Sequence, residues 1–597
     1  MKTLLIDGSG NGRESPRHAG TRDGLPMQPE GCGNTPAELP RWLSWIESHP
    51  YAVILILIAS MLLPFVGKPF HLDDPMYLWA GRHIVRHPLD FYGLSVAWTG
   101  TIAPMWWLNQ NPPLTSYFIA LATTLAGGSE VALHGAFLVP ATLALVGTWQ
   151  CGRLYTRWPV LATILTGVMP VFALCGTTIM ADMMMLSFWV WAVALWETGL
   201  RQRRWGWLLA AGLVAGLGIL TKYPAINLLP LLCLAVIVRR APLRYLLALL
   251  IPVAMVVSYD LMTRELYGTG LFSQAMGYAG RLAERHQRLP ARTMFTALCF
   301  TGGCLAPVAL LLPWVAGRRP LIVGAIMGAA VFATVLWTGW PSLPTETADG
   351  LIWRTPPGFA LQVAAWATVG AGVVWLAVFD ALRHRDADAF VLAAWMLGII
   401  FFAGLFNWSV NGRTLLPLAP VAGILLTRAL DSRSLPRSRM AAVVLPATLA
   451  AAGAFAVTIN AADFSLAAAS RRAAEDVAAL AQAEGRRLWF QGHWGFQHYC
   501  QENGGLPFLH GASRTRPGDI LVTPLYGSNV RLLGEPWVST LAVTNEPLMG
   551  GLSVMHPLTG AAFYTDVRGP LPFVIGPVPD ERFLIQEVED GPAPSTP

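Results

Sequence analysis

The chain has 597 residues, of which 54% are hydrophobic and 13% are charged, and its formal net charge is +6. Soluble proteins carry roughly 25% charged residues, so this composition excludes a water-soluble globular protein and predicts one whose apolar surface faces lipid. The positive charge does not indicate nucleic acid, and we expect no such partner, because the arginines stand at the ends of apolar segments.

The N-terminal segment, residues 1–42, is rich in Gly, Pro, Glu and Arg and lacks the apolar core of a signal peptide. We expect a disordered cytoplasmic tail, the alternative being a start codon placed too early. The first apolar run, residues 51–66, has no small-residue cleavage site after it. It is therefore expected to remain as a membrane anchor.

Apolar runs recur along residues 43–460, which we expect to form one transmembrane domain. A bilayer core of about 30 Å takes about 20 apolar residues in a helix, so the runs predict about thirteen spans. The fold class expected is therefore an all-α polytopic membrane protein. The runs are at 51–67, 131–150, 158–177, 183–199, 205–222, 224–238, 244–262, 295–316, 320–340, 359–379, 389–407, 415–430 and 440–460.

Arginine placement predicts the orientation, because short cytoplasmic connections carry an excess of Lys and Arg. With the N-terminus in the cytoplasm of a bacterial cell, every short cytoplasmic connection is basic, and residues 461–597 lie in the periplasm. In that segment, strand-like pieces at 487–491 and 519–524 alternate with a helical stretch at 466–484, which predicts a small α/β domain. The arginines concerned are Arg153, Arg157, Arg201, Arg203, Arg204, Arg239, Arg240, Arg244, Arg318, Arg319, Arg383, Arg385, Arg428, Arg433, Arg437 and Arg439.

A long periplasmic loop, residues 68–130, follows the first span and begins with the acidic pair Asp73 and Asp74. Adjacent carboxylates repel one another, which raises a pKa unless a cation offsets it. Such a pair suits a general base or a cation ligand. The alternative is a solvated loop start with a proline turn.

A second periplasmic loop, residues 263–294, is strongly basic, which departs from the distribution of charge in the rest of the chain. A basic cluster on that side needs an anionic partner, and a lipid phosphate or pyrophosphate is the natural one. The alternative is general attraction to anionic headgroups. The basic residues are Arg264, Arg281, Arg285, His286, Arg288 and Arg292, against Glu265 and Glu284.

Three single charges border apolar runs at the same membrane face: Asp182, Lys222 and Arg413. The alternative for Asp182 is a helix N-cap, and for Lys222 and Arg413 it is snorkelling to the interface. Together with the first loop, these positions converge on one face. That convergence predicts a site there.

The quoted residues resemble those of the GT-C glycosyltransferases, in particular the protein O-mannosyltransferases and the lipid A aminoarabinose transferases. Asp73 and Asp74 with Tyr77 resemble the acidic first-loop motif of that family, and Asn111 begins a proline-containing element similar to its second motif. The resemblance covers about residues 45–430 in order. Later landmarks lie at 177–182, 216–224 and 411–420.

The resemblance implies an inverting sugar transfer from a polyprenyl-phosphate donor at the periplasmic face, with Asp73 as general base and Asp74 assisting it or binding a cation. It implies substrate contacts for Tyr77, Asn111, Lys222, Arg281, Arg285 and Arg413, the cations facing the leaving phosphate. His286 would join these cations or bind a divalent metal, for which Asp182 is the other candidate ligand. Asn111 stands where the aminoarabinose branch has an acidic metal ligand, and an amide is a weaker one.

The function expected is thus a membrane glycosyltransferase acting on a lipid, glycan or protein acceptor at the bilayer. The alternatives are a polytopic transporter or lipid flippase, and an inactive scaffold that presents the terminal domain. A transporter is expected to place charges near the bilayer midplane on broken helices. The expected spans are nearly free of internal charge, which favours chemistry at one face.

Overall fold

The computed structural model describes residues 40–285, 289–347, 350–433, 442–528, 530, 532–534 and 536–589, all within one compact unit. Residues 1–39 of the expected N-terminal tail lie outside the described residues. Its last residues belong to helix α1 (Arg41–Ser48). A helix therefore begins at Arg41, within the segment expected as a tail.

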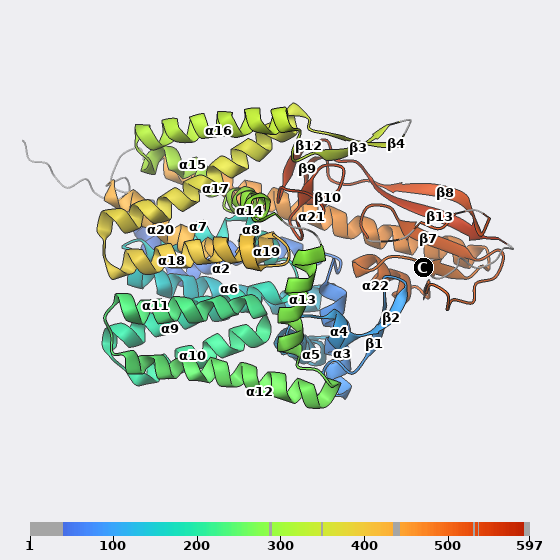
Figure 1. The fold of residues 1–597 in the computed structure, drawn as a ribbon, viewed down its shortest axis with the longest axis horizontal. Coiled ribbons are helices and arrows are strands. Elements are labelled where there is room, and N and C mark those ends of the chain that lie inside the picture. The colour runs from blue at the N-terminus through green and yellow to red at the C-terminus, as the bar shows by residue number, and fades with distance from the viewer. Residues whose placement is uncertain are drawn as a thin grey trace, which may run out of the picture. The chain divides into compact units, whose positions relative to one another are not determined.

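Helices form most of the structure (Figure 1). Within the described residues, seven helical segments are long and apolar enough to cross a bilayer. Two bent pairs raise this number to nine if each pair is one span: α1 with α2 (Pro50–Met61) and η1 (Leu63–Phe65), bent by 95°, and α14 (Pro290–Cys304) with α15 (Pro307–Val315), bent by 87°. The chain is a mostly helical, multi-pass membrane protein. The seven segments are α6 (Glu130–Tyr155), α9 (Ala181–Gln202), η3–α12 (Leu243–Tyr267), α16 (Arg318–Thr338), α17 (Pro357–His384), α18–η4 (Ala387–Phe406) and α21 (Val444–Ala483).

The other apolar runs are also helical, but prolines interrupt them. The run at 158–177 becomes α7 (Pro159–Gly167) and α8 (Pro170–Cys175), because Pro170 has no N–H to donate and disfavours helical backbone at the residue before it. The run at 205–222 gives α10 (Trp205–Thr221), and the run at 224–238 gives η2 (Tyr223–Asn227) and α11 (Leu228–Val238). The run at 415–430 becomes α20 (Leu418–Ser432). Apolar length alone predicts about thirteen spans, because it does not show where a proline breaks a helix.

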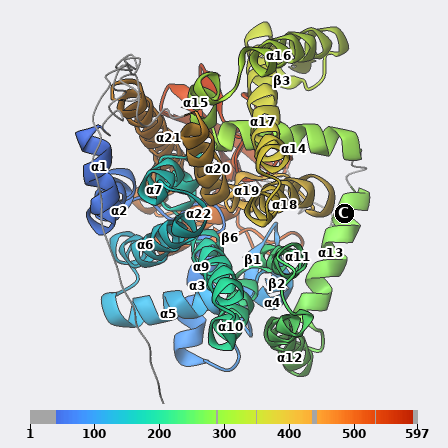
Figure 2. The same ribbon diagram turned by 90° about the vertical axis from the view of Figure 1, so that its left-hand side faces the viewer.

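Apolar exposure shows which helices face lipid. Only 6% of the apolar window of α16 is buried in the protein, against 78% of that of α9. Ile322, Val323 and Ile326 of α16 are each more than half exposed. In the end-on view α16 lies at the margin of the helices (Figure 2), where only lipid can cover such a surface.

The first long loop is folded rather than irregular. It contains α3 (Asp74–Arg86), a hairpin of β1 (Ser95–Trp98) and β2 (Thr101–Pro104), α4 (Met105–Leu108) and α5 (Leu114–Ala126). Thr99 and Gly100 join the two strands with φ of 49° and 79°, as a type I′ hairpin turn requires. The second loop forms α13 (Leu271–Arg285), which runs across the direction of the long helices (Figures 1 and 2).

The C-terminal domain contains a mixed five-stranded sheet in the order β6-β5-β7-β13-β8. β5 pairs in parallel with β6 and β7, whereas β13 is antiparallel to both β7 and β8. Phe490, Phe496 and Phe583 of this domain pack against Val477 and Ala481 of α21. The strands are β5 (Leu488–Phe490), β6 (Leu506–Pro507), β7 (Ile520–Pro524), β8 (Val538–Glu546) and β13 (Glu581–Val588), beside helix α22 (Trp494–Glu502) and the small pairs β9 (Gly551–Ser553) with β12 (Val574–Gly576) and β10 (Met555–His556) with β11 (Ala561–Ala562).

Helix α21 connects the two regions without interruption. Its 40 residues begin in the last apolar run and end against the C-terminal sheet. The domain boundary expected at residue 461 therefore falls inside a continuous helix. The membrane region and the terminal domain share this element.

Candidate functional site

Asp73 and Arg413 meet at the end of the helices from which the first loop emerges. Arg413 Nη1 donates a hydrogen bond of 2.9 Å to Asp73 Oδ2, and a second of 2.9 Å to the thioether sulfur of Met180. The Asp73 side chain is 34% exposed, whereas that of Arg413 is 15% exposed. A carboxylate that is reachable from outside is thus held by a largely buried guanidinium.

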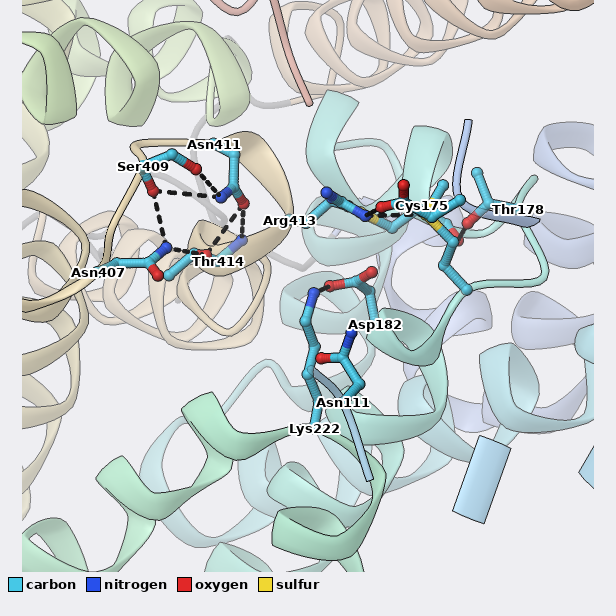
Figure 3. A network of polar contacts seen from close by, with 12 residues as sticks. Asn111, Cys175, Thr178, Asp182, Lys222, Asn407, Ser409, Asn411, Arg413 and Thr414 are labelled. Atoms are coloured by element: carbon cyan, nitrogen blue, oxygen red, sulfur yellow. Dashed lines mark hydrogen bonds and ion pairs between the residues drawn. The ribbon is translucent and has the colours of Figure 1, made fainter. Parts of the chain in front are cut away.

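A local network fixes the backbone that carries Arg413 (Figure 3). The Asn411 side chain accepts from Thr414 N at 2.8 Å and so caps α19 (Gly412–Leu415). Gly412 N donates to the Phe563 carbonyl at 2.8 Å, and a Cβ on Gly412 would lie 2.1 Å from the Phe563 ring. Only glycine permits this contact between α19 and the C-terminal domain, which explains the Asn-Gly-Arg sequence.

Asp74 has different surroundings from Asp73. Its Oδ2 accepts the His71 N–H and its Oδ1 accepts the Ile179 N–H, both at 3.0 Å. Burial raises the pKa of Asp74 to about 7, against the opposing effects of Lys68 and the two backbone bonds. Both carboxylate oxygens are therefore engaged in tying the first loop to the segment before α9.

Asp182 and Lys222 form a second ion pair, of 2.6 Å between Oδ1 and Nζ (Figure 3). Asp182 opens α9, and Lys222 ends α10. Within the described part of the chain, the second oxygen of Asp182 is buried without a hydrogen-bond partner. Asp182 and Lys222, for which a helix cap and snorkelling were the alternatives to a site role, are thus joined to each other.

Tyr77 lies in the same neighbourhood and Asn111 follows the β1–β2 hairpin. Burial raises the pKa of the Tyr77 phenol, and the nearby Asp182 and Asp73 raise it further, so that it remains protonated. Asn111 is half-buried, and its N–H donates to Asn109 Oδ1 at 3.1 Å. Figure 3 shows its side chain on the same side of the site as the Asp182–Lys222 pair.

The basic second loop is only partly described. Arg281 lies on the exposed side of α13, and no hydrogen bond or ion pair among the described residues joins it to Asp73 or Asp182. The side chain of Arg285 and the whole of His286 lie outside the described residues. The guanidinium of Arg292 instead stacks on Trp340, 5.0 Å from the centre of the ring.

The described residues do not fit a metal centre. They contain no group of three or more His, Cys, Asp or Glu side chains able to hold an ion. Asp182 has the ammonium of Lys222 at 2.6 Å, and the positive charge of Arg413 is close by. Two cations beside one carboxylate repel a divalent ion, so no step below involves a metal.

Sequence reasoning missed a buried cluster next to the acidic pair. Lys68 Nζ donates to Asp463 of α21 and, at 3.2 Å, to the Thr177 carbonyl, and both charged side chains are fully buried. Tyr564 donates to the same carboxylate at 2.9 Å. The available signals were the rarity of lysine and an isolated acid at the end of the last apolar run, but 395 residues separate the two.

Comparison with known families adds to this geometry. Residues 110–260 match the model of a family described as dolichyl-phosphate-mannose-protein mannosyltransferase. The resemblance to that family is thereby confirmed over this segment. The match to the mannosyltransferase family contains Asn111, Asp182 and Lys222, whereas Asp73 and Arg413 lie outside it. Comparison with curated protein sequences finds no match.

Solved structures similar to this chain include an oligosaccharyltransferase and ArnT. The oligosaccharyltransferase of Archaeoglobus fulgidus, tethered to an acceptor peptide, is 13% identical over 78% of this chain, with a TM-score of 0.45, and the chain spans 64% of that protein's length. The oligosaccharyltransferase AglB from Archaeoglobus fulgidus, in complex with an inhibitory peptide and a dolichol-phosphate, is 12% identical over 80% of this chain and 69% of that one, with a TM-score of 0.46. ArnT from Cupriavidus metallidurans, bound to undecaprenyl phosphate, is 15% identical over 81% of this chain and 93% of that one, with a TM-score of 0.35.

Proposed function

We propose that this protein is an inverting GT-C glycosyltransferase that moves a sugar from a polyprenyl-phosphate donor to an acceptor at the periplasmic face of a bacterial inner membrane. The observation that carries the proposal is the arrangement of Asp73 beside Arg413, with the Asp182–Lys222 pair in the same neighbourhood. A general base and cations for a leaving phosphate are the groups that such a transfer needs.

The proposed chemistry gives the acids and the cations of this arrangement separate roles. The acceptor oxygen attacks the anomeric carbon while its proton passes to the Asp73 carboxylate. The bond between that carbon and the phosphate oxygen breaks, and the polyprenyl phosphate leaves with its negative charge. Arg413 and Lys222 stabilise that charge, because each is a cation held at the end of a helix. Asp74 positions the base by anchoring the turn that precedes α3.

The donor class is supported by the family match and by the ligands of the similar structures. The matched family is described by a dolichyl-phosphate sugar donor, and ArnT and AglB were solved with undecaprenyl phosphate and dolichol-phosphate. All three share a phosphate on a polyprenyl chain. A phosphate is also the group that the cations Lys222 and Arg413 are suited to bind.

The orientation is supported by charges at the far end of α9. There Arg201 and Arg239 pair with Asp388 at 2.8 and 2.5 Å. At 1.5 Å per residue, the 22 residues of α9 separate this basic end from Asp182 by about 30 Å, the thickness of a bilayer core. A cytoplasmic basic end implies a periplasmic site.

The proposal is tested by assaying transfer from a panel of radiolabelled polyprenyl-phosphate sugars with the purified protein and with Asp73→Asn. The substitution preserves shape and removes the base, so we expect the transfer rate to fall at least about 100-fold. The thermal unfolding midpoint should remain close to that of the wild type, because the Asp73 side chain is partly exposed.

Asp476→Asn is the matched control, since Asp476 is an exposed carboxylate on the part of α21 that packs against the C-terminal sheet. We expect it to retain full transfer. If the wild-type protein transfers none of the sugars, or if Asp73→Asn transfers as well as Asp476→Asn, the base assignment fails. A transporter or flippase then becomes the better interpretation of the fold.

A further inference from the structure

A cavity of about 170 Å³ lies between the hairpin of the first loop and the C-terminal domain. Trp98 and Gly100 of the hairpin form one side, and Gln491, Gln497 and Phe508 form the other. The cavity is separate from the residues assigned to phosphate binding, since neither Lys222 nor Arg413 lines it.

Two contacts fix the hairpin against the domain. Gln497 Nε2 donates to the Ala97 carbonyl and His510 N donates to the Gly100 carbonyl, both at 2.8 Å. A Cβ on Gly100 would lie 2.2 Å from the His510 ring, so this approach requires glycine. The walls of the cavity are therefore preformed rather than assembled by a ligand.

Two glutamines that line this cavity carry buried polar atoms without a hydrogen-bond partner among the described residues. Gln491 is 6% exposed and Gln497 is 1% exposed. Among the described residues, Gln491 Nε2 and Gln497 Oε1 have no hydrogen-bond partner. Most buried polar atoms in native proteins have one, so an unmet donor and an unmet acceptor in one cavity point to a ligand that supplies both.

The remaining wall indicates the chemistry of that ligand. Trp98 and Phe508 supply aromatic surface, and no Asp, Glu, Lys or Arg side chain lines the cavity among the described residues. An ionic ligand would lose its hydration there without a compensating charge. The volume is below the roughly 300 Å³ at which pockets for drug-sized ligands begin, so the space suits one small ring.

The cavity adjoins the candidate site. The Trp98 ring, which lines it, lies 4.6 Å from the ring of His493. Burial lowers the pKa of His493 to about 3, and Asp73 is close enough to oppose that shift. One histidine is thus near both the cavity wall and the carboxylate proposed as the base.

From this geometry we infer that the cavity binds a neutral sugar ring of the acceptor, through hydroxyl groups that pair with Gln491 and Gln497 and apolar ring faces that pack on Trp98 and Phe508. A sugar hydroxyl can accept a hydrogen bond from Gln491 Nε2 and donate one to Gln497 Oε1, the two atoms that lack a partner among the described residues. The assignment to the acceptor rests on the proposed function. The inference that the cavity binds a sugar ring does not depend on that function.

The test is a titration of the full-length protein in nanodiscs with methyl glycosides of hexoses and pentoses, followed by ligand-detected saturation-transfer NMR. The variants are Gln491→Ala and, as matched control, Gln501→Ala, an exposed glutamine on α22. We expect one or more glycosides to bind the wild type and Gln501→Ala equally. Gln491→Ala should bind roughly tenfold more weakly, because it loses one hydrogen bond.

Two results would overturn the sugar site: no glycoside binds the wild type, or Gln491→Ala binds as tightly as Gln501→Ala. Adding a polyprenyl-phosphate sugar then tests the assignment to the acceptor. If this donor displaces the glycoside, the cavity holds the donor sugar and the acceptor assignment fails. Since the titration contains no donor, loss of glycoside binding in Gln491→Ala supports the cavity even if the transfer assay shows no activity.

Discussion

Lys68 and Asp463 illustrate how the two charges of a buried ion pair depend on each other. Removing one partner leaves a buried charge without compensation, which typically costs 3–5 kcal/mol, whereas replacing both partners with apolar groups costs much less. We therefore expect Lys68→Met to lower the unfolding midpoint strongly. The double variant Lys68→Met/Asp463→Leu should lie closer to the wild type, although Tyr564 then loses its acceptor.

The measurement is the thermal unfolding midpoint in detergent, by intrinsic fluorescence, for both single variants and the double variant. The cycle isolates the interaction energy of the pair. Strictly additive losses, with the double variant the least stable, would show that the two charges do not depend on each other.

At the residue scale, the sequence singled out charges that the structure brings into ion pairs, but it did not predict their partners. Asp73, Asp182, Lys222 and Arg413 stand out because each charge borders an apolar run, where charges are costly. Their partners are not local, since 340 residues separate Asp73 from Arg413. For the same reason the different surroundings of Asp73 and Asp74 could not be foreseen, since the second partner of Asp74 lies 105 residues away.

At the scale of elements, we expect α21 to stabilise the C-terminal domain by anchoring it to the membrane region. Ala468 is half-buried within it, past Asp463. Ala468→Pro removes the N–H of that position and places a ring against the preceding turn, at about 3 kcal/mol or more. Ala468→Gly, the control, costs about 1 kcal/mol and keeps the hydrogen bond.

We expect Ala468→Pro to increase hydrogen exchange of backbone amides in the second half of α21 and in α22, which packs against it. Ala468→Gly should change these rates little. The readout is hydrogen exchange followed by mass spectrometry on the full chain. Equal exchange in the two variants would mean that the C-terminal domain is ordered independently of the helix.

The sequence predicted the helical elements more reliably than their continuity. Each apolar run became helix, because its backbone polar groups must be satisfied internally. Breaks before Pro170 and Pro307 were not foreseen, since a proline at the first position of a new helix and a proline inside a kinked helix look alike in the sequence. The 87° bend between α14 and α15 depends on packing.

At the scale of the molecule, buried histidines lie in the first loop and in the C-terminal domain that contacts it. Burial lowers the pKa of His71 to about 4, that of His493 to about 3 and that of His498 to about 4. As the pH falls from about 6.5 toward 4, the unfolded chain takes up protons that the folded protein excludes. Stability therefore falls over that window, by up to about 1.4 kcal/mol per pH unit for each histidine.

The measurement is the unfolding midpoint between pH 7.5 and pH 4.5, compared with that of His498→Gln and of His87→Gln. His87 is exposed on the first loop and serves as the control. We expect the midpoint to decrease on acidification, less steeply in His498→Gln and unchanged in slope in His87→Gln. A midpoint that depends on pH as steeply in His498→Gln as in the wild type would contradict the buried, neutral state of that ring.

The membrane class and a small mixed α/β domain were predictable at this scale, because composition and the change from apolar runs to short strands signal them directly. The packing of the first loop on that domain was not. Phe70 N donates to the Tyr499 hydroxyl at 2.8 Å, and that hydroxyl donates to Glu130 at 3.0 Å. Such a relay joins three separate segments, and nothing in any one of them marks the other two.

The continuity of α21 also sets a height. Its 40 residues extend about 60 Å, roughly twice the thickness of a bilayer core. The length of the helix beyond the bilayer therefore fixes the distance of the terminal domain from the membrane. Each added residue would raise the terminal domain by about 1.5 Å and turn it by about 100°, moving the Gln491 cavity away from Asp73. Under the proposed function, the length of this helix therefore determines how far an acceptor hydroxyl must extend to reach Asp73.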